Sequence, residues 1–107
     1  MPVIGTFSAV ENGYAGAIST LTLNAKVLIL ANPPKEGRNT PDFRVMVGAV
    51  EVGAAWRRRI EGSQKVLLRV KLDDPTFPEP IWGALLEPGA DGIARLVWLR
   101  DWQDDRA

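Results

Sequence analysis

Hydrophobic and polar positions alternate most clearly in residues 66–72, where every second side chain is apolar. Val66, Leu68, Val70 and Leu72 fall on one face of an extended strand, and Leu67, Arg69 and Lys71 fall on the other. Period-two alternation is the pattern of a half-buried β-strand. Residues 50–59 alternate less cleanly, and a turn-like cluster at 61–64 separates the two runs. We therefore predict a β-hairpin whose outer face carries most of the positive charge.

The register of this hairpin decides where Trp56 lies. A loop of four residues, 61–64, pairs Trp56 with Arg69 and leaves the tryptophan on a basic outer surface. A loop of three or five residues instead turns Trp56 into the core beside Leu68 and Val70, because a one-residue slip moves a side chain to the other face. The alternate residues before Trp56 on its own face are apolar. We therefore favour the buried position.

The rest of the chain also divides into short extended segments with turn signals between them. The further strands that we expect are residues 3–10, 14–23, 25–31, 81–86 and 93–99. Asn12-Gly13 favours a two-residue type I′ turn, which would place Phe7 opposite Ile18. Three prolines within residues 75–80 exclude regular strand pairing there.

Seven or eight short strands with regular turn signals indicate an all-β fold. We expect one domain over residues 1–107 with an acidic tail at 100–107. The domain should be a compact antiparallel barrel or sandwich. Among specific folds, an OB-like barrel is our first candidate. The sequence contains no helical pattern that could supply the helix that usually plugs that fold.

The absence of both cysteine and histidine removes many kinds of catalytic site. Disulfides and thiolate chemistry are excluded, and zinc sites and histidine-dependent triads lose their usual groups. Asp73, Asp74 and Glu79 are carboxylates of the kind that bind a hard cation, but the neighbouring prolines indicate turn chemistry instead. We expect no catalytic residue, no metal site and no cofactor, and therefore a protein that is not an enzyme.

Cellular location is indicated by three features of the chain. It has no cysteine, no charged and apolar leader at its start, and no apolar run near the roughly 20 residues that span a bilayer. We expect a cytoplasmic protein that does not enter a membrane.

Charge is zero overall but unevenly spread along the chain. Residues 26–72 hold ten Lys or Arg against four acids, a net charge of +6, and residues 73–107 hold eight acids against three arginines, a net charge of −5. Basic surfaces with aromatic side chains are typical of proteins that bind single-stranded nucleic acid. The candidate binding residues are Arg44, Arg57, Arg58, Arg59, Arg69 and Lys71. The alternative is that these arginines cover the rim of a buried Trp56.

Tryptophan content suggests a second kind of surface. Strands at 81–86 and 93–99 leave apolar residues on both faces, and exposed apolar patches usually mark association. Trp82, Trp98 and Trp102 are the candidate interface residues of a homodimer formed through the C-terminal strand. The alternative function is thus a protein-interaction or self-assembling module without a nucleic-acid role.

Several short stretches together resemble a known protein family. They are Ile4-Gly5-Thr6-Phe7, Glu11-Asn12-Gly13-Tyr14, Leu21-Thr22-Leu23-Asn24, Pro41-Asp42-Phe43-Arg44-Val45, Gly53-Ala54-Ala55-Trp56 and Lys71-Leu72-Asp73-Asp74-Pro75. The chain is similar over about residues 4–100 to domain-of-unknown-function family 736. The resemblance implies a small bacterial protein, often carried by plasmids and other mobile elements, with no established activity and no functional residues to transfer.

The chain departs from that family pattern in its central hairpin. The usual member has lysines after the tryptophan and an aromatic residue at the start of the next strand. Here those places hold Arg57-Arg58-Arg59 and Val66-Leu67. Any binding platform that the aromatic residue provides in relatives is therefore missing from this position.

Overall fold

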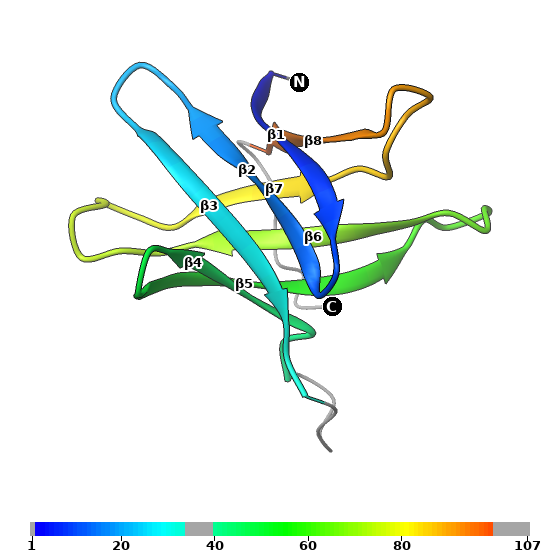
Figure 1. The fold of residues 1–107 in the computed structure, drawn as a ribbon, viewed down its shortest axis with the longest axis horizontal. Helices are drawn as coiled ribbons and strands as arrows, with labels where there is room; N and C mark the ends of the chain where they lie inside the picture. The colour runs from blue at the N-terminus through cyan, green and yellow to red at the C-terminus, as the bar shows by residue number, and fades with distance from the viewer. Residues whose placement is uncertain (1, 34–39, 100–107) are drawn as a thin grey trace.

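Eight β-strands form the molecule, which we describe from a computed structural model over residues 2–33 and 40–99. The strands are β1 (Val3–Val10), β2 (Gly13–Ser19), β3 (Asn24–Ala31), β4 (Phe43–Val47), β5 (Val50–Arg59), β6 (Val66–Leu72), β7 (Ile81–Leu85) and β8 (Ile93–Trp98). Figure 1 shows β1 to β3 crossing in front of β5 to β7. The described residues contain no helix that is long and apolar enough to cross a membrane.

Each strand pairs antiparallel with the next strand in the chain, and β8 pairs back onto β1 to close the sheet into a barrel. Closure matters because an open sheet would leave two rows of unpaired backbone groups at its edges. The expected all-β barrel is confirmed, and the sandwich alternative is not what forms. The OB-like version is wrong, because an OB-fold is a five-stranded Greek-key barrel whereas this barrel runs up and down through eight strands.

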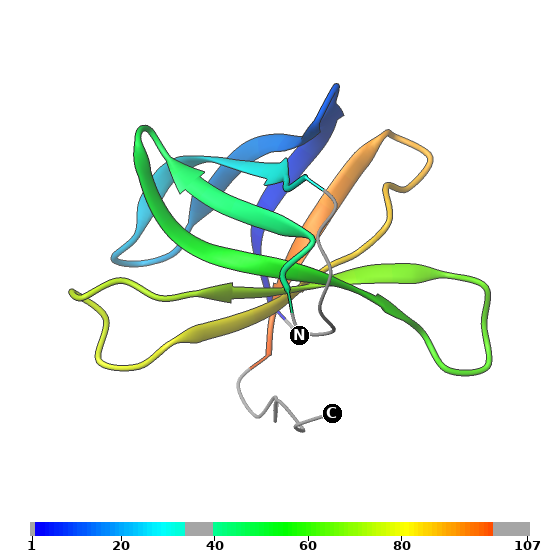
Figure 2. The same ribbon diagram turned by 90° about the horizontal axis from the view of Figure 1, so that it is seen from below.

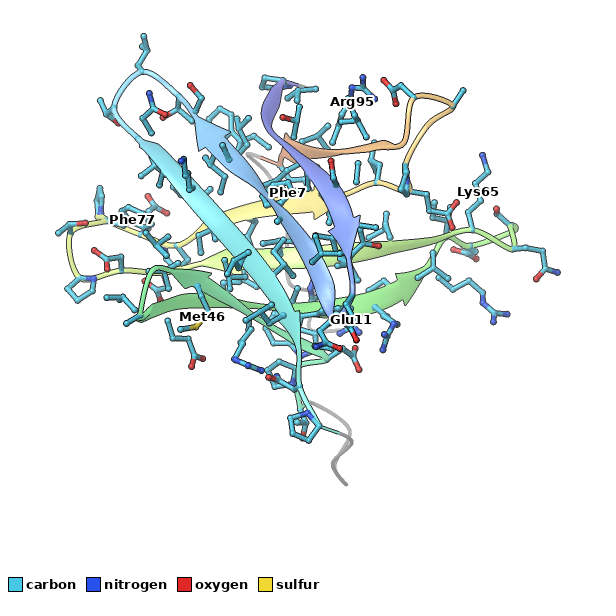
Figure 3. All side chains as sticks on the ribbon, in the orientation of Figure 1. Phe7, Glu11, Met46, Lys65, Phe77 and Arg95 are labelled. Carbon is cyan, nitrogen blue, oxygen red and sulfur yellow. The ribbon has the colours of Figure 1, made fainter. Side chains whose placement is uncertain are left out.

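The core lies inside the barrel and is filled by alternate residues of the strands. An eight-stranded barrel is just narrow enough for its own side chains to fill. Phe7, Ile29, Val45, Val70 and Leu96 are almost completely buried. Figure 3 shows Phe7 at the centre, between the front and back strands. Each of these strands contributes to one continuous core, which is why the separate short strands hold together.

Two inward-facing glycines let neighbouring strands approach closely. A Cβ atom on Gly16 would collide with the Thr6 carbonyl oxygen and lie 2.7 Å from Phe7 Cα. A Cβ atom on Gly53 would collide with the Lys71 carbonyl oxygen. Glycine inside a strand commonly marks such a close backbone approach. These two positions therefore allow β1 to meet β2, and β5 to meet β6, at the curvature that closure requires.

The first hairpin turns one residue earlier than the sequence indicates. Val10 pairs with Gly13, so the two turn residues are Glu11 and Asn12, and Phe7 lies opposite Gly16 rather than Ile18. Gly13 instead begins β2 with a φ of 150°, where a Cβ atom would collide with the Ile29 carbonyl oxygen. Close packing against β3 therefore requires a glycine at position 13. This glycine lies in β2 and not in the turn, where the Asn-Gly motif had placed it.

The two ends of the barrel carry different loops. The β2–β3, β4–β5 and β6–β7 connections gather at one end, and the β1–β2, β5–β6 and β7–β8 connections lie toward the other (Figure 1). Figure 3 places Phe77 at the first end and Lys65 at the second. We call them the Phe77 end and the Lys65 end.

Replacing Gly16 by alanine should destabilise the barrel. The new methyl group would press against the backbone of β1, which cannot move aside as a flexible side chain can. We expect the free energy of unfolding to fall by about 3 kcal/mol, the upper part of the usual range for overpacking. Urea denaturation measures this difference.

Gly89→Ala is the matched control for that substitution. The nearest atom to a Cβ at Gly89 is the Asp91 Oδ1 at 3.5 Å, an ordinary contact distance. Its free energy of unfolding should change by less than about 1 kcal/mol. Equal effects of the two substitutions would contradict the close approach of β1 and β2.

Candidate nucleic-acid interface

The register of the β5–β6 hairpin places Trp56 on the outside of the barrel. Trp56 pairs with Arg69, and the Ile60 amide donates a hydrogen bond to the Lys65 carbonyl oxygen at 2.9 Å, so the loop has four residues. Directly opposed residues share one face of a sheet. Ala55, not Trp56, points into the core, where it is 0% exposed. The prediction of a buried Trp56 is therefore wrong.

A bulge in β5 explains why the alternation of apolar residues predicted the wrong face for Trp56. Val45 pairs with Gly53 and Met46 with Glu51, so Val52 has no partner in β4. The extra residue of a bulge interrupts the alternation of faces along its strand. Val50 and Val52 consequently line an apolar pocket at the Phe77 end of the barrel, while Trp56 faces outward.

Two tryptophans and two cations form one cluster on the outer face of β5, β6 and β7. The Arg69 Cζ lies 5.3 Å from the ring centroid of Trp56 and 5.3 Å from that of Trp82. The Lys71 Nζ lies 5.5 Å from the Trp82 ring, which its strand register places opposite it. We call Trp56, Arg69, Trp82 and Lys71 the tryptophan–cation cluster.

Arg69 is buried to an extent that is unusual for an arginine, with 5% of its surface exposed. Its guanidinium is held between two aromatic rings, and the negative faces of those rings attract a cation. Arginine suits this place better than lysine because its group is planar, delocalised and weakly hydrated. Its burial fixes the orientation of both tryptophans, each of which remains only partly covered.

Arg58 and Arg44 extend the basic character of this outer face. Arg58 lies two residues after Trp56 on the same face of β5 and pairs with Leu67 of β6. Arg44 of β4 pairs with Ala54 of β5, and Ala54 pairs in turn with Lys71 of β6. The Arg44 Nη1 donates hydrogen bonds to the Ala31 carbonyl oxygen at 3.1 Å and to the Asn32 Oδ1 at 3.0 Å. Four predicted binding residues, namely Arg44, Arg58, Arg69 and Lys71, thus lie on one face.

The other two predicted binding residues lie on the opposite face of β5. Arg57 and Arg59 pair with Leu68 and Val66, whose side chains face inward. Near the Lys65 end, the Arg57 Cζ stacks 4.9 Å from the Phe43 ring, and its backbone amide donates to the Asp42 Oδ2 at 2.8 Å. The three consecutive arginines therefore do not form a single patch.

The three tryptophans of the predicted dimer surface do not share one environment. Trp82 belongs to the tryptophan–cation cluster. Trp98 pairs with Gly83 on the inner side of β8 and lines a cleft of about 750 Å³ at the Phe77 end, which Trp82 also borders. Trp102 and the acidic tail at 100–107 lie outside the described residues. Association through the C-terminal strand stays a prediction.

Asp74 acts as a turn residue in the proline-rich β6–β7 connection. Its Oδ2 accepts hydrogen bonds from the Thr76 Oγ1 at 2.5 Å and from the Thr76 amide at 3.0 Å. These bonds, the side-chain one foremost, lower the pKa of the Asp74 carboxyl below its usual value. Among residues 2–33 and 40–99, no three acidic side chains gather as metal ligands.

Sequence reasoning missed the role of Trp82. The missing information was the register of β7 against β6, which pairs Lys71 with Trp82 and Arg69 with Ala84. The connection of β6 to β7 runs through the proline-rich segment, so no turn rule fixes that register from the sequence. The only signal in the sequence was that Arg69 and Lys71 lie on one face of the same strand, so that an aromatic residue opposite them would contact a cation.

Comparison with known proteins identifies a family. A family model described as "Protein of unknown function (DUF736)" matches residues 3–101. Neither the curated proteins nor the solved structures contain a match to this chain.

Arg69→Met should destabilise the protein by removing the cation that joins the two rings. Methionine keeps an apolar stem of similar length, so the loss reports mainly on the guanidinium. We expect the free energy of unfolding, measured by urea denaturation, to fall by about 1–4 kcal/mol, since a cation–π contact is worth roughly 0.5–2 kcal/mol and two rings are involved. Arg59→Met, at an exposed position of the same hairpin, should change it by less than about 0.5 kcal/mol. Equal losses would show that the cluster contributes nothing specific.

Proposed function

This chain belongs to the DUF736 family, and we propose that it is a non-enzymatic protein that binds single-stranded nucleic acid through the outer face of β5, β6 and β7. The setting that we propose is the cytoplasm of a bacterium, as an accessory protein of a mobile element. The lack of histidine and cysteine supports a binding role over a catalytic one.

The observation that carries the proposal is the tryptophan–cation cluster. Single strands are bound by aromatic side chains on which bases stack, combined with cations that contact the phosphates. Arg69 lies between Trp56 and Trp82 and holds both rings in place, so their exposed parts are ready for a base without further ordering. Preorganised groups lose less conformational entropy when a ligand binds.

The charge of this face supports a polyanion as the ligand. The outward positions of the paired parts of β5, β6 and β7 are Ala54, Trp56, Arg58, Leu67, Arg69, Lys71, Trp82 and Ala84. They include three cations, two tryptophans and no carboxylate. Arg44 on β4 adds a fourth cation beside them. A phosphate backbone would therefore meet no like charge across this part of the barrel wall.

Binding of oligothymidine should weaken steeply as salt rises. Arg44, Arg58 and Lys71 are the partly exposed cations of this face, whereas Arg69 is buried between the rings. Each phosphate contact contributes a slope of about −0.7 in log affinity against log salt for single strands, so these three cations give a slope near about −2. Arg58→Ala combined with Lys71→Ala should flatten the slope by about 1.4, because two contacts are lost. Fluorescence anisotropy of a labelled oligothymidine, beginning in low salt, measures both slopes.

Arg59→Ala combined with Lys26→Ala is the matched control. It removes the same number of positive charges from exposed positions away from the outer face of β5 to β7. Arg59 lies on the inner side of β5 but is exposed where the barrel opens at the Lys65 end, and Lys26 lies on β3. This control should keep a slope close to that of the unmodified protein. Absence of binding at tens of micromolar protein, or equal slopes for both double variants, would refute the proposed function.

A further inference from the structure

The Phe77 end of the barrel holds a pocket that the proposed nucleic-acid interface does not use. Its volume is about 280 Å³, larger than a buried leucine side chain needs. Apolar side chains make up most of its lining, with Val27, Val47, Val52, Leu72 and Phe77 among them. Figure 3 shows Phe77 at this end, in the connection between β6 and β7. An apolar pocket open to solvent is a place where burial of another apolar group is favourable.

A completely exposed leucine lies on the loop that borders this pocket. Leu21 is 103% exposed at the tip of the β2–β3 connection, and Leu23 of the same connection lines the pocket. The tip is held by hydrogen bonds, because the Thr20 Oγ1 accepts from the Leu23 amide at 3.0 Å and the Thr20 amide donates to the Leu23 carbonyl oxygen at 2.7 Å. Leu21 is thus presented to solvent on an ordered turn.

We propose that Leu21 of one copy inserts into the apolar pocket of a second copy, so that two chains form a dimer through their Phe77 ends. Because the projection and the pocket lie at the same end of the molecule, two copies that meet end to end about a two-fold axis can make both insertions at once. Val50, 57% exposed at the pocket, becomes covered in the same contact.

Electrostatics also favour a second copy over a charged partner at this pocket. Asp74 is the one ionisable residue among the described residues that line it. Its carboxylate is already engaged by the Thr76 amide and hydroxyl. Two copies therefore bring together one hydrogen-bonded carboxylate each, and the other described residues that line the pocket are uncharged.

The pocket of this dimer shares no residue with the tryptophan–cation cluster, although Trp82 of the cluster borders the neighbouring cleft. Figure 2 shows β6 and β7 as a side wall of the barrel, whereas the pocket opens among the loops at the barrel end. The neighbouring cleft that Trp98 lines shares Leu23, Thr76 and Phe77 with the pocket. Association at this end would thus involve the surroundings of Trp98 without needing a free strand edge, which the closed barrel lacks.

Sedimentation equilibrium without nucleic acid tests the dimer. The unmodified protein should sediment as a dimer at about 100 μM. Leu21→Asp should raise the dissociation constant at least ~100-fold, because two leucine insertions are lost together. Since Leu21 makes no buried contact, this variant should unfold at the same urea concentration as the unmodified protein. Val10→Asp, an exposed apolar position at the Lys65 end, should leave the dimer intact.

A complementation experiment distinguishes insertion from a general loss of surface hydrophobicity. Val50→Lys should also give a monomer, because it places a charge at the rim of the pocket. A mixture of Leu21→Asp and Val50→Lys should recover a mixed dimer. In that dimer one native insertion is kept, and at the other site the new aspartate faces the new lysine.

Four outcomes would overturn the proposal, and the first three concern the unmodified protein and the variants at the Phe77 end. These three are a monomeric unmodified protein at 100 μM, a dimer that persists in Leu21→Asp, and a mixture of the two variants that stays monomeric. Loss of the dimer in Val10→Asp would move the contact to the other end of the barrel and would overturn it equally. None of these results depends on whether the side wall binds nucleic acid.

Discussion

The pairing of Ile60 with Lys65 across a four-residue loop decides what each side of the central hairpin does. Side chains alternate with a period of two, so a slip of one residue would exchange the inner and outer faces of either strand. In the observed register the barrel interior receives Ala55 and Val70, and the outer wall receives Trp56 and Arg69. The core and the candidate binding surface thus both depend on the same few hydrogen bonds.

Closure of the barrel separates two regions with different chemistry. The wall of β5 to β7 carries aromatic rings and cations, while the Phe77 end carries an apolar pocket and an exposed leucine. Every strand is paired on both sides, so neither region can act by adding a strand to an edge. Recognition must therefore use side chains, which is why the placement of a few large residues matters so much here.

Much of the fold followed from the sequence, whereas the site followed only in part. The strands of the barrel could be predicted because apolar alternation and turn residues are local signals. Closure could not, because the pairing of β1 with β8 joins distant parts of the chain. Trp56 was wrongly predicted to be buried because the bulge at Val52 exchanges the two faces of β5 partway along the strand. The prediction had assumed an uninterrupted alternation from Val50 to Trp56. Trp82 was assigned to a dimer surface because nothing local links it to Lys71.

The most direct test of the central claim is the NMR spectrum of the tryptophan indole N–H groups, assigned by single Trp→Phe substitutions. Oligothymidine added at low salt should shift or broaden the signals of Trp56 and Trp82, because bases stack on those rings at the outer wall. The signal of Trp98, which lines the cleft at the barrel end, should stay in place. Unchanged signals of Trp56 and Trp82 at saturating oligonucleotide would contradict the account.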